Sequence, residues 1–274
     1  MSSYYNEWDP YCAQWLRNLI DAGHLAPGDV DERSIVDVQA DDLRGYGQCH
    51  FFSGIAGWPY ALRLAGWSSD REVWTGSCPC QPLSCAGQRK GDADERHLWP
   101  AFFRLIAERR PATIFGEQVS GKDGLEWLSA VRADLEGIGY AVGAADLPAC
   151  SVGAPHIRRR LFWVAHAERS GDAGELGDSG SERRRQVCAN TAGSKEGSGA
   201  EGLAERPLHE RNGNPWSDLE WLPCIDGKWR PTKPGLFPLA HGIPGRVGKL
   251  RAAGNAIVAP LAAEFIMAAM ELMP

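Results

Sequence analysis

The sequence contains no run of 18 apolar residues, so it predicts no membrane-spanning helix. Its first residues, MSSYYNEWDPYC, lack the basic-then-apolar order of a secretion signal. The eight cysteines are too few and too scattered for a disulfide scaffold, and we expect most of them to be small buried apolar side chains. These absences predict a cytoplasmic protein that has no membrane partner.

An excess of positive charge is also missing, because the net charge of the 274 residues is −6. The charge is unevenly distributed: residues 1–150 carry a net charge of −8 and residues 151–274 one of +2. The second half contains the locally basic segments HIRRRLF, SERRRQV, GKWRPTK and GRVGKLR. The total argues against a nucleic-acid partner, but a DNA-facing second half stays open because local fields steer polyanions more than the total charge does.

Strand-like and helix-like segments alternate over the first 165 residues. The expected strands are SSYYNEW, QCHFF, EVWTG, ATIFGEQV and RLFWVAHA. The expected helices are YCAQWLRNLIDA, which begins after Asp9 as N-cap and Pro10, then WPYALRLAGW, HLWPAFFRLIAERR and GLEWLSAVRADLEGIG. This alternation predicts an α/β fold with a parallel sheet that helices cover on both faces.

The rest of the chain has a different character. Residues 167–215 are rich in glycine, serine and charged side chains, which predicts a long or partly disordered loop. Tryptophan and proline dominate residues 214–246 and predict irregular, turn-rich structure. The last segment, AAGNAIVAPLAAEFIMAAMELM, predicts a C-terminal helix.

The segment SCPCQPLS at residues 77–84 surrounds a thiol with prolines. A metal site is disfavoured because Cys78, Cys80 and Cys85 have the wrong spacing and no CxxC pair exists to complete it. A redox pair would also be spaced CxxC. We favour a nucleophile at Cys80, stiffened by Pro79 and Pro82 just after an expected strand.

Three further segments carry weaker signals. FFSGIAG, between an expected strand and helix, fits either a turn that approaches a nucleotide-like ligand or a plain tight turn. Glu117 ends another strand in GEQV, where it could protonate a substrate or simply be exposed. In HIRRRLF, a strand that begins near Arg158 would place Arg158 and Arg160 on one face, suited to phosphate or a base carbonyl, unless they form a solvated edge.

Taken in order, FFSGIAG, PCQPLS, EQV, RRRLF and GNAIV resemble the blocks of the DNA cytosine-5 methyltransferase family. The resemblance implies a Rossmann-like S-adenosylmethionine-dependent methyltransferase sheet with helices on both faces, and a small irregular target-recognition region. It implies transfer of a methyl group from S-adenosyl-L-methionine to C5 of cytosine in double-stranded DNA, in a bacterial or phage-infected cell. We expect a monomer with a catalytic and cofactor-binding domain at residues 1–166, the target-recognition region at 167–240 and a returning segment at 241–274.

One departure concerns the order of the blocks. The family places an acidic strand end for the cofactor ribose and an aspartate for adenine between the glycine-rich turn and the Pro-Cys-Gln loop, but here only residues 58–77 separate the two. Instead, YNEWDPYCAQWL and GDVDERSI at the N-terminus are similar to the absent blocks. We infer a circular permutation, in which Glu7 would bind the ribose, Trp8 would stack on adenine, and Asp31, or its rival Asp29, would accept the adenine amino group.

The resemblance also assigns roles to individual residues. The Cys80 thiolate would add to C6 of a flipped-out cytosine while Glu117 binds the base at N3 and its amino group. Arg158 and Arg160 would hold the base carbonyl and the loop, and Gln81 would contact DNA as the loop closes. The cofactor residues implied are Glu7, Trp8, Asp31, Phe52, Ser53, Gly54, Ile55, Gly57, Pro79 and Asn255, and the DNA-binding residues implied are Ser84, Gln88, Arg89, Lys90, Lys228, Arg230 and Lys233.

Two substitutions depart from the family pattern, since Gln118 replaces an asparagine and His50 stands where an acidic residue is common. Asn255 could also be a helix N-cap after Gly254. Trp216, Trp221 and Trp229 fit a small core better than a base reader. The alternatives to a methyltransferase are a catalytically silent DNA-binding protein, or transfer to a free pyrimidine nucleotide or of a group other than methyl.

Overall fold

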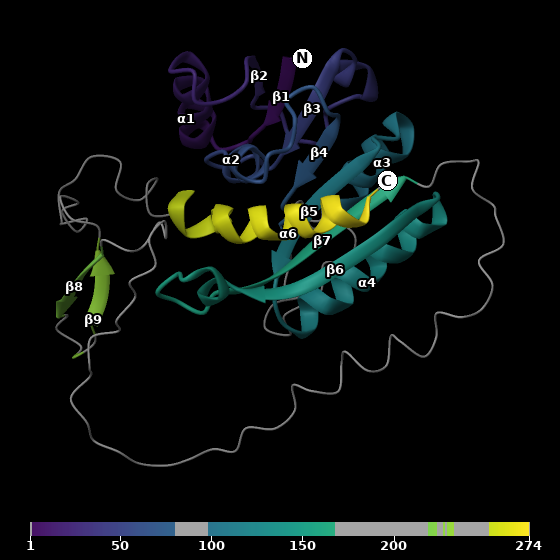
Figure 1. The fold of residues 1–274 in the computed structure, drawn as a ribbon. Coiled ribbons are helices and arrows are strands. Elements are labelled where there is room, and N and C mark those ends of the chain that lie inside the picture. The colour runs from purple at the N-terminus through teal and green to yellow at the C-terminus, as the bar shows by residue number, and fades with distance from the viewer. Residues whose placement is uncertain are drawn as a thin grey trace, which may run out of the picture. The chain divides into compact units, whose positions relative to one another are not determined.

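The computed structural model describes residues 2–79, 98–167, 219–223, 227, 229–232 and 252–273. Seven strands form one sheet in the order β2-β1-β3-β4-β5-β7-β6 (Figure 1). The strands are β1 (Ser2–Asn6), β2 (Gly28–Asp31), β3 (Tyr46–Phe51), β4 (Val73–Gly76), β5 (Thr113–Val119), β6 (Tyr140–Pro148) and β7 (Arg159–Ala167). The first strand, β1, therefore lies between β2 and β3, and β3 lies between β1 and β4.

The sheet is parallel from β2 to β5, as the sequence predicts. The prediction is wrong for β7, which pairs antiparallel with both β5 and β6. The reason is the connection after β6, a single 3-10 turn (Ala149–Val152) that returns the chain as a hairpin instead of a helical crossover. The strand β6 was not predicted from the sequence, because its alanines, glycine and exposed positions give no apolar alternation.

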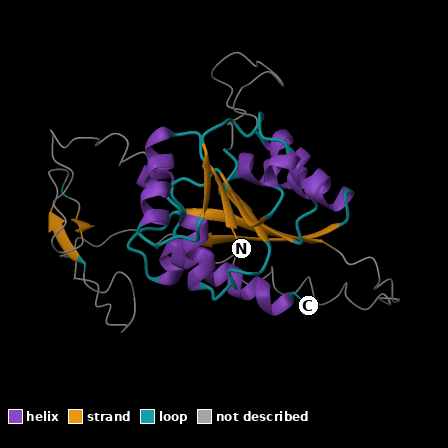
Figure 2. Ribbon diagram, turned by 90° about the horizontal axis from the view of Figure 1, so that it is seen from above, coloured by secondary structure: helices purple, strands orange, loops and turns teal. Residues whose placement is uncertain are grey.

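Helices cover both faces of the sheet (Figure 2). On one face, α3 (Trp99–Arg109) and α4 (Lys122–Gly137) pack with Ile114 and Trp163. On the other face, α2 (Gly57–Leu64) and α6 (Ala259–Leu272) pack with Phe115 and Phe162. Since neighbouring residues of a strand point to opposite faces, β5 and β7 supply apolar side chains to both cores.

The first helix, α1 (Pro10–Asp21), begins where the sequence predicts. The Asp9 carboxylate accepts hydrogen bonds from the backbone N–H groups of Tyr11 and Cys12, which would otherwise lack partners at the helix start. Leu16 packs with Tyr5 of β1 and with Ala56. This packing attaches the N-terminal segment to the turn that follows β3.

The predicted C-terminal helix is interrupted. Residues 252–255 form one helical turn, Ala256, Ile257 and Val258 are not helical, and α6 begins at Ala259 after Val258 as N-cap. The N-cap expectation for Asn255 is therefore wrong. Pro260 explains the break, because proline lacks an N–H and its ring clashes with the carbonyl four residues earlier.

Residues 252–272 are long and apolar enough to span a membrane by length and composition alone. In this structure, however, α6 packs on the sheet, with Leu261, Ala262 and Ile266 buried against α2 and β7. We interpret the segment as a core helix, since packing against α2 and the sheet accounts for its apolar residues.

A two-stranded antiparallel hairpin pairs β8 (Glu220–Pro223) with β9 (Trp229–Thr232). Trp229 is 55% exposed, so the expected tryptophan core does not include it among the described residues. Trp216 lies outside the described residues. The described cysteines are Cys12, Cys49 and Cys78, which are buried as expected, and Cys150, which is exposed.

A glycine is required at position 116 because β5 passes directly beneath Trp163. A Cβ atom there would lie 2.2 Å from the buried indole ring. We expect Gly116→Ala to lower the free energy of unfolding by about 3 kcal/mol, measured by urea denaturation, since the ring has no room to move. Gly137→Ala in α4 is the control, because nothing lies within 4 Å of its added Cβ. Equal stability of the two variants would contradict this packing.

Candidate functional site

The site forms where β4 and β5 end side by side. Gly76, the last residue of β4, pairs with Gly116 of β5. Since the strands are parallel, Ser77 and Cys78 lie beside Glu117 and Gln118. The sequence segments SCPC and GEQV are thus in register at the carboxyl edge of the sheet, which is the usual position of ligand sites in α/β folds.

The Glu117 side chain is nearly buried, with 8% of its surface exposed. Its Oε1 atom lies 2.7 Å from Nε of Arg160 on the neighbouring strand β7. Burial raises the pKa of the Glu117 carboxyl, against the opposing effects of Arg160, a hydrogen bond from Ser77 and the more distant charge of Arg158. A glutamate that holds its proton more firmly than usual can donate a hydrogen bond to a substrate.

Gln118 connects β5 to the thiol-bearing segment. Its Nε2 atom donates a hydrogen bond to the backbone carbonyl of Cys78 at 3.2 Å, and its Oε1 atom accepts one from the N–H of Val119 at 2.8 Å. Both Gln118 and Cys78 are 2% exposed. The longer amide at this position therefore fixes the path of the chain just before Pro79, which is exposed.

Arg158, Arg159 and Arg160 contact different partners. Arg158 precedes β7 rather than belonging to it, with a φ of 27°, so the expectation of two arginines on one strand face is wrong. Its guanidinium donates to the carbonyls of Gly254 and Ala256 at 2.8 and 3.0 Å. These carbonyls lie at the break before α6, so Arg158 fixes the returning segment beside the site. Arg159 pairs instead with Asp146 at 3.1 Å.

The glycine-rich turn after β3 has an unusual backbone. Phe52, Gly54 and Ala56 have positive φ values of 52°, 55° and 72°. Non-glycine residues rarely adopt this conformation, and it is a common feature of ligand sites. The N–H of Gly54 donates to Oε2 of Glu7 at 2.6 Å, and the N–H of Asp9 donates to Oε1 at 2.8 Å. The Glu7 carboxylate therefore joins the end of β1 to the turn.

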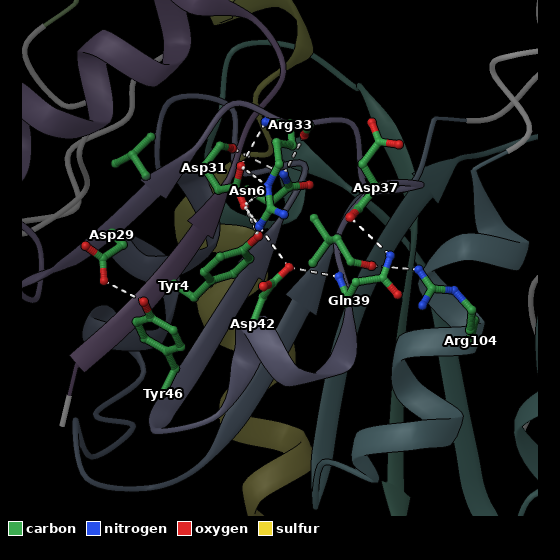
Figure 3. Close-up of polar contacts among 12 residues, drawn as sticks. Tyr4, Asn6, Asp29, Asp31, Arg33, Asp37, Gln39, Asp42, Tyr46 and Arg104 are labelled. Carbon is green, nitrogen blue, oxygen red and sulfur yellow. Dashed lines mark hydrogen bonds and ion pairs between the residues drawn. The ribbon is translucent and has the colours of Figure 1, made fainter.

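Trp8, the residue after Glu7, is 69% exposed, which is unusual for a large aromatic side chain. Asp31 ends β2 in register with Asn6 of β1, whereas Asp29 lies earlier in the strand and accepts a hydrogen bond from Tyr46. The Asp31 carboxylate already accepts hydrogen bonds from Tyr4 and Arg33 (Figure 3). An adenine amino group would therefore have to share this carboxylate with Arg33.

The Asp31 network is strongly charged. Arg33 also binds Asp42 at 2.9 Å, so it bridges two carboxylates. Burial acts to raise the pKa of Asp31, but its hydrogen bonds from Arg33 and Tyr4 outweigh this and hold the pKa below its usual value. Asp31 is therefore a carboxylate at neutral pH.

His50 departs from the acidic residue that the family pattern favours. Its imidazole is fully buried, stacks on Tyr5, and hydrogen-bonds through Nδ1 to Oγ1 of Thr75 at 2.9 Å. Burial lowers the pKa of His50 to about 3, so the side chain is neutral. Within the described residues, its Nε2 atom has no hydrogen-bond partner. This position therefore supplies no negative charge.

The remaining expected residues divide into two groups. Phe52, Ser53, Gly54, Ile55 and Gly57 all lie in the turn or at the start of α2, and Asn255 is exposed in the helical turn before α6. Those outside the described residues are Cys80, Gln81, Ser84, Gln88, Arg89, Lys90, Lys228 and Lys233, together with the side chain of Arg230. Among the described residues, no cluster of histidine, cysteine, aspartate and glutamate could hold a metal ion.

Sequence reasoning missed Trp58 and Ser77. Trp58 Nε1 donates to Oγ of Ser77 at 3.0 Å. The Ser77 hydroxyl in turn acts to lower the pKa of the neighbouring Glu117 carboxyl. Ser77 stands in the SCPC segment, but only the pairing of Gly76 with Gly116 reveals that it faces the glutamate.

Curated methyltransferases match part of this chain. Type II methyltransferase M.AplI of Arthrospira platensis is 36% identical over 97 residues, covering 35% of this chain and 28% of that protein. M.AgeI of Thalassovita gelatinovora is 37% identical over 100 residues, covering 35% of this chain and 23% of that protein. The matched segment thus spans about a quarter of the length of these curated relatives.

Two solved structures also match parts of the fold. The S. pombe Dnmt2 methyltransferase has a TM-score of 0.40 and 16% identity, over 63% of this chain and 52% of that chain. A putative DNA modification methyltransferase encoded within an E. coli prophage has a TM-score of 0.41 and 19% identity, over 61% of this chain and 40% of that chain. The family model for C-5 cytosine-specific DNA methylase matches residues 50–192, which is 143 of the 274 residues. The chain therefore belongs to the C-5 cytosine-specific DNA methylase family.

Proposed function

We propose that this protein transfers a methyl group from S-adenosylmethionine to C5 of cytosine in double-stranded DNA. The observation that carries the proposal is the register of β4 and β5, which places the segment leading to Cys80 beside a buried Glu117 and Arg160. Family membership supports the same activity. A carboxyl that holds its proton and a cation at one sheet edge, where the segment that leads to Cys80 begins, suit covalent activation of a pyrimidine.

The chemical role of the thiol follows from the weak nucleophilicity of cytosine C5. The Cys80 thiolate adds to C6 of a flipped-out cytosine, and the electron pair of the C5–C6 double bond moves to C5, which becomes enamine-like. Bound S-adenosylmethionine supplies an electrophilic methyl group. After C5 has been methylated, a base removes the C5 proton, the double bond re-forms and the thiolate leaves. Cys80 ends the cycle unchanged.

Glu117 stabilises the charge that develops on the ring. Addition of a thiolate at C6 increases the electron density at N3, and a protonated Glu117 donates a hydrogen bond there. Its raised pKa favours this protonated form. Arg160, at 2.7 Å, keeps the carboxyl in position, while Arg158 holds the segment before α6.

The cofactor would lie along the ends of β1, β2 and β3. Glu7 would accept hydrogen bonds from the ribose hydroxyls, Trp8 would stack on adenine, and Asp31 would share its carboxylate between Arg33 and the adenine amino group. The Glu7 carboxylate accepts a hydrogen bond from Gly54, the Trp8 indole is exposed, and the turn after β3 has positive φ values. These three features fit such a ligand. We further propose that the chain is circularly permuted, since β1 and β2 precede β3 in sequence but lie beyond it in the sheet.

Target recognition is assigned to residues 167–240, between the catalytic domain at 1–166 and the returning segment at 241–274. Lys228, Arg230 and Lys233 would contact phosphates there. Gln81, Ser84, Gln88, Arg89 and Lys90 would contact DNA from the segment around Cys80. The exposed Trp229 suits contact with a partner better than packing in a core.

The direct test incubates the protein with duplex DNA and S-adenosylmethionine that carries a labelled methyl group, followed by mass spectrometry of the digested nucleosides. We expect labelled 5-methylcytosine. No labelled base in duplexes of varied sequence would indicate a silent DNA-binding protein, and label on free pyrimidine nucleotides alone would change the substrate.

The cofactor assignment predicts a large loss of binding in Glu7→Ala. We expect the Kd for S-adenosylmethionine, measured by isothermal titration calorimetry, to rise at least about tenfold, because one charge-assisted hydrogen bond contributes about 1.5 kcal/mol or more. Glu32→Ala is the matched control, since among the described residues this carboxylate pairs with the half-exposed Arg17. Unchanged affinity in Glu7→Ala would contradict both the ribose role and the permutation.

A further inference from the structure

Trp58 and Ser77 connect the start of α2 with the sheet edge where Glu117 lies. Trp58 is the second residue of α2 and directly follows the glycine-rich turn. Its Nε1 donates to Oγ of Ser77 at 3.0 Å. The register of β4 and β5 puts Ser77 beside Glu117, and the Ser77 hydroxyl acts to lower the pKa of the Glu117 carboxyl. Trp58 is 3% exposed and Glu117 is 8% exposed, so little water competes for these groups.

The chemistry of the groups determines which of them donates. A serine hydroxyl has one hydrogen to donate. The indole N–H of Trp58 can only donate, so Ser77 accepts from Trp58 and its own hydrogen is available for Glu117. Arg160 holds Oε1 of the same carboxyl from β7 at 2.7 Å. Glu117 of β5 therefore has a cation on its β7 side and an oriented hydroxyl on its β4 side.

We propose that Trp58 and Ser77 are positioning residues that orient the Glu117 carboxyl toward the pyrimidine and connect it to the turn before α2. This inference rests on the proposed methyltransferase function. The two residues connect the glycine-rich turn, which we assign to cofactor binding, with the Glu117 carboxyl, which we assign to binding of the base. The helix that follows the cofactor turn thereby contributes to the alignment of the second substrate.

If Trp58 serves only to pack the core, Trp58→Phe should leave kcat unchanged. The indole ring stacks near Phe115 and meets Phe162 edge-on, with ring centroids 6.2 and 6.1 Å apart, and these contacts need no N–H. Trp58→Phe keeps an aromatic ring there and removes only the donor. Ser77→Ala removes the hydroxyl, and Ser77→Thr restores one.

The first measurement is steady-state methyl transfer to duplex DNA. We expect kcat of Ser77→Ala to fall about tenfold or more, because a Glu117 carboxyl that is no longer oriented meets N3 of the base in a poorer geometry, with KM for S-adenosylmethionine nearly unchanged. Ser77→Thr should recover most of the rate. Trp58→Phe should lower kcat by a smaller factor. It should have no further effect in a Ser77→Ala background, because Trp58 acts on Glu117 through the Ser77 hydroxyl.

The second measurement does not depend on activity. The Glu117 carboxyl faces Arg160, Arg158 and the Ser77 hydroxyl, and its pKa can be followed by NMR of carbon-labelled glutamate. Removing the hydroxyl removes a group that favours the carboxylate, so the Glu117 pKa should rise in Ser77→Ala and return in Ser77→Thr. The alkaline limb of the kcat profile should move to higher pH with it.

Three results would overturn the inference. One is a Ser77→Ala protein with unchanged kcat and an unchanged Glu117 pKa. Another is a loss of rate that Ser77→Thr does not repair and that follows a lower Tm, since packing would then explain it. The third is full additivity of the two substitutions. If the wild-type protein transfers no methyl group to any DNA, the proposed function fails, and the Glu117 pKa still decides whether Ser77 orients the carboxyl.

Discussion

Cys80→Ser should reduce methyl transfer below detection while S-adenosylmethionine still binds. A serine hydroxyl at neutral pH is almost entirely protonated and is a far weaker nucleophile than a thiolate, so C6 of the base would not be attacked. Transfer of a labelled methyl group to duplex DNA measures the activity, and calorimetry measures cofactor binding. Cys80 lies outside the described residues, so the expectation rests on the family pattern and on the position of Cys78 and Pro79.

Cys78→Ala is the matched control for this variant. Cys78 is 2% exposed and packs in the core between the sheet and α3, so its thiol is not available to a substrate. Its backbone carbonyl, which Gln118 binds, is unaffected by the substitution. We expect a loss of about 1 kcal/mol in stability and retained transfer. Loss of transfer in Cys78→Ala, with activity preserved in Cys80→Ser, would reassign the nucleophile.

Glu117→Gln should lower kcat by about a hundredfold or more, because a glutamine donates a weaker hydrogen bond to N3 and cannot release a proton. Binding of S-adenosylmethionine should remain, since no cofactor contact involves this side chain in our account. Single-turnover methylation with saturating cofactor measures the chemical step. A variant with the wild-type rate would remove Glu117 from the mechanism.

The same substitution should alter the pH dependence of stability. The folded pKa of Glu117 lies above the ordinary value of 4.5, so its favourable contribution is fully present below pH 4.5 and is lost as the pH rises through the folded pKa. Glutamine has no such dependence. The Tm of Glu117→Gln relative to wild type should therefore increase between pH 4.5 and pH 8, even though the substitution removes the ion pair with Arg160. A relative Tm that falls over this range would contradict a destabilising buried carboxylate.

Local patterns were sufficient to predict most of the sheet and its helices. Asp9 and Pro10 mark the start of α1, and a short apolar run marks β5 as a buried strand, because capping and burial act within a few residues. The direction of β7 could not be predicted, since it depends on a short hairpin after β6, whose alanines and glycine carry no periodic signal. The break before α6 was foreseeable from Pro260, but the apolar composition on both sides obscured it.

The candidate site was predicted as separate motifs rather than as an arrangement. The thiol segment and Glu117 were identified because their residue types are reactive wherever they stand. Ser77 and Trp58 were missed because their roles depend on the pairing of Gly76 with Gly116 and on the packing of α2. The partners of the three arginines could not be predicted either, since Arg158 binds the carbonyl of Gly254, which lies almost a hundred residues later in the chain.

The most direct test of the central claim uses a duplex that contains 5-fluorocytosine together with S-adenosylmethionine. Fluorine at C5 cannot leave as a proton does, so the thiolate cannot be expelled and the covalent adduct persists. Digestion and tandem mass spectrometry should then find the methylated fluoropyrimidine attached to the sulfur of Cys80. Demonstrated binding of both DNA and cofactor with no adduct at Cys80 would contradict the account.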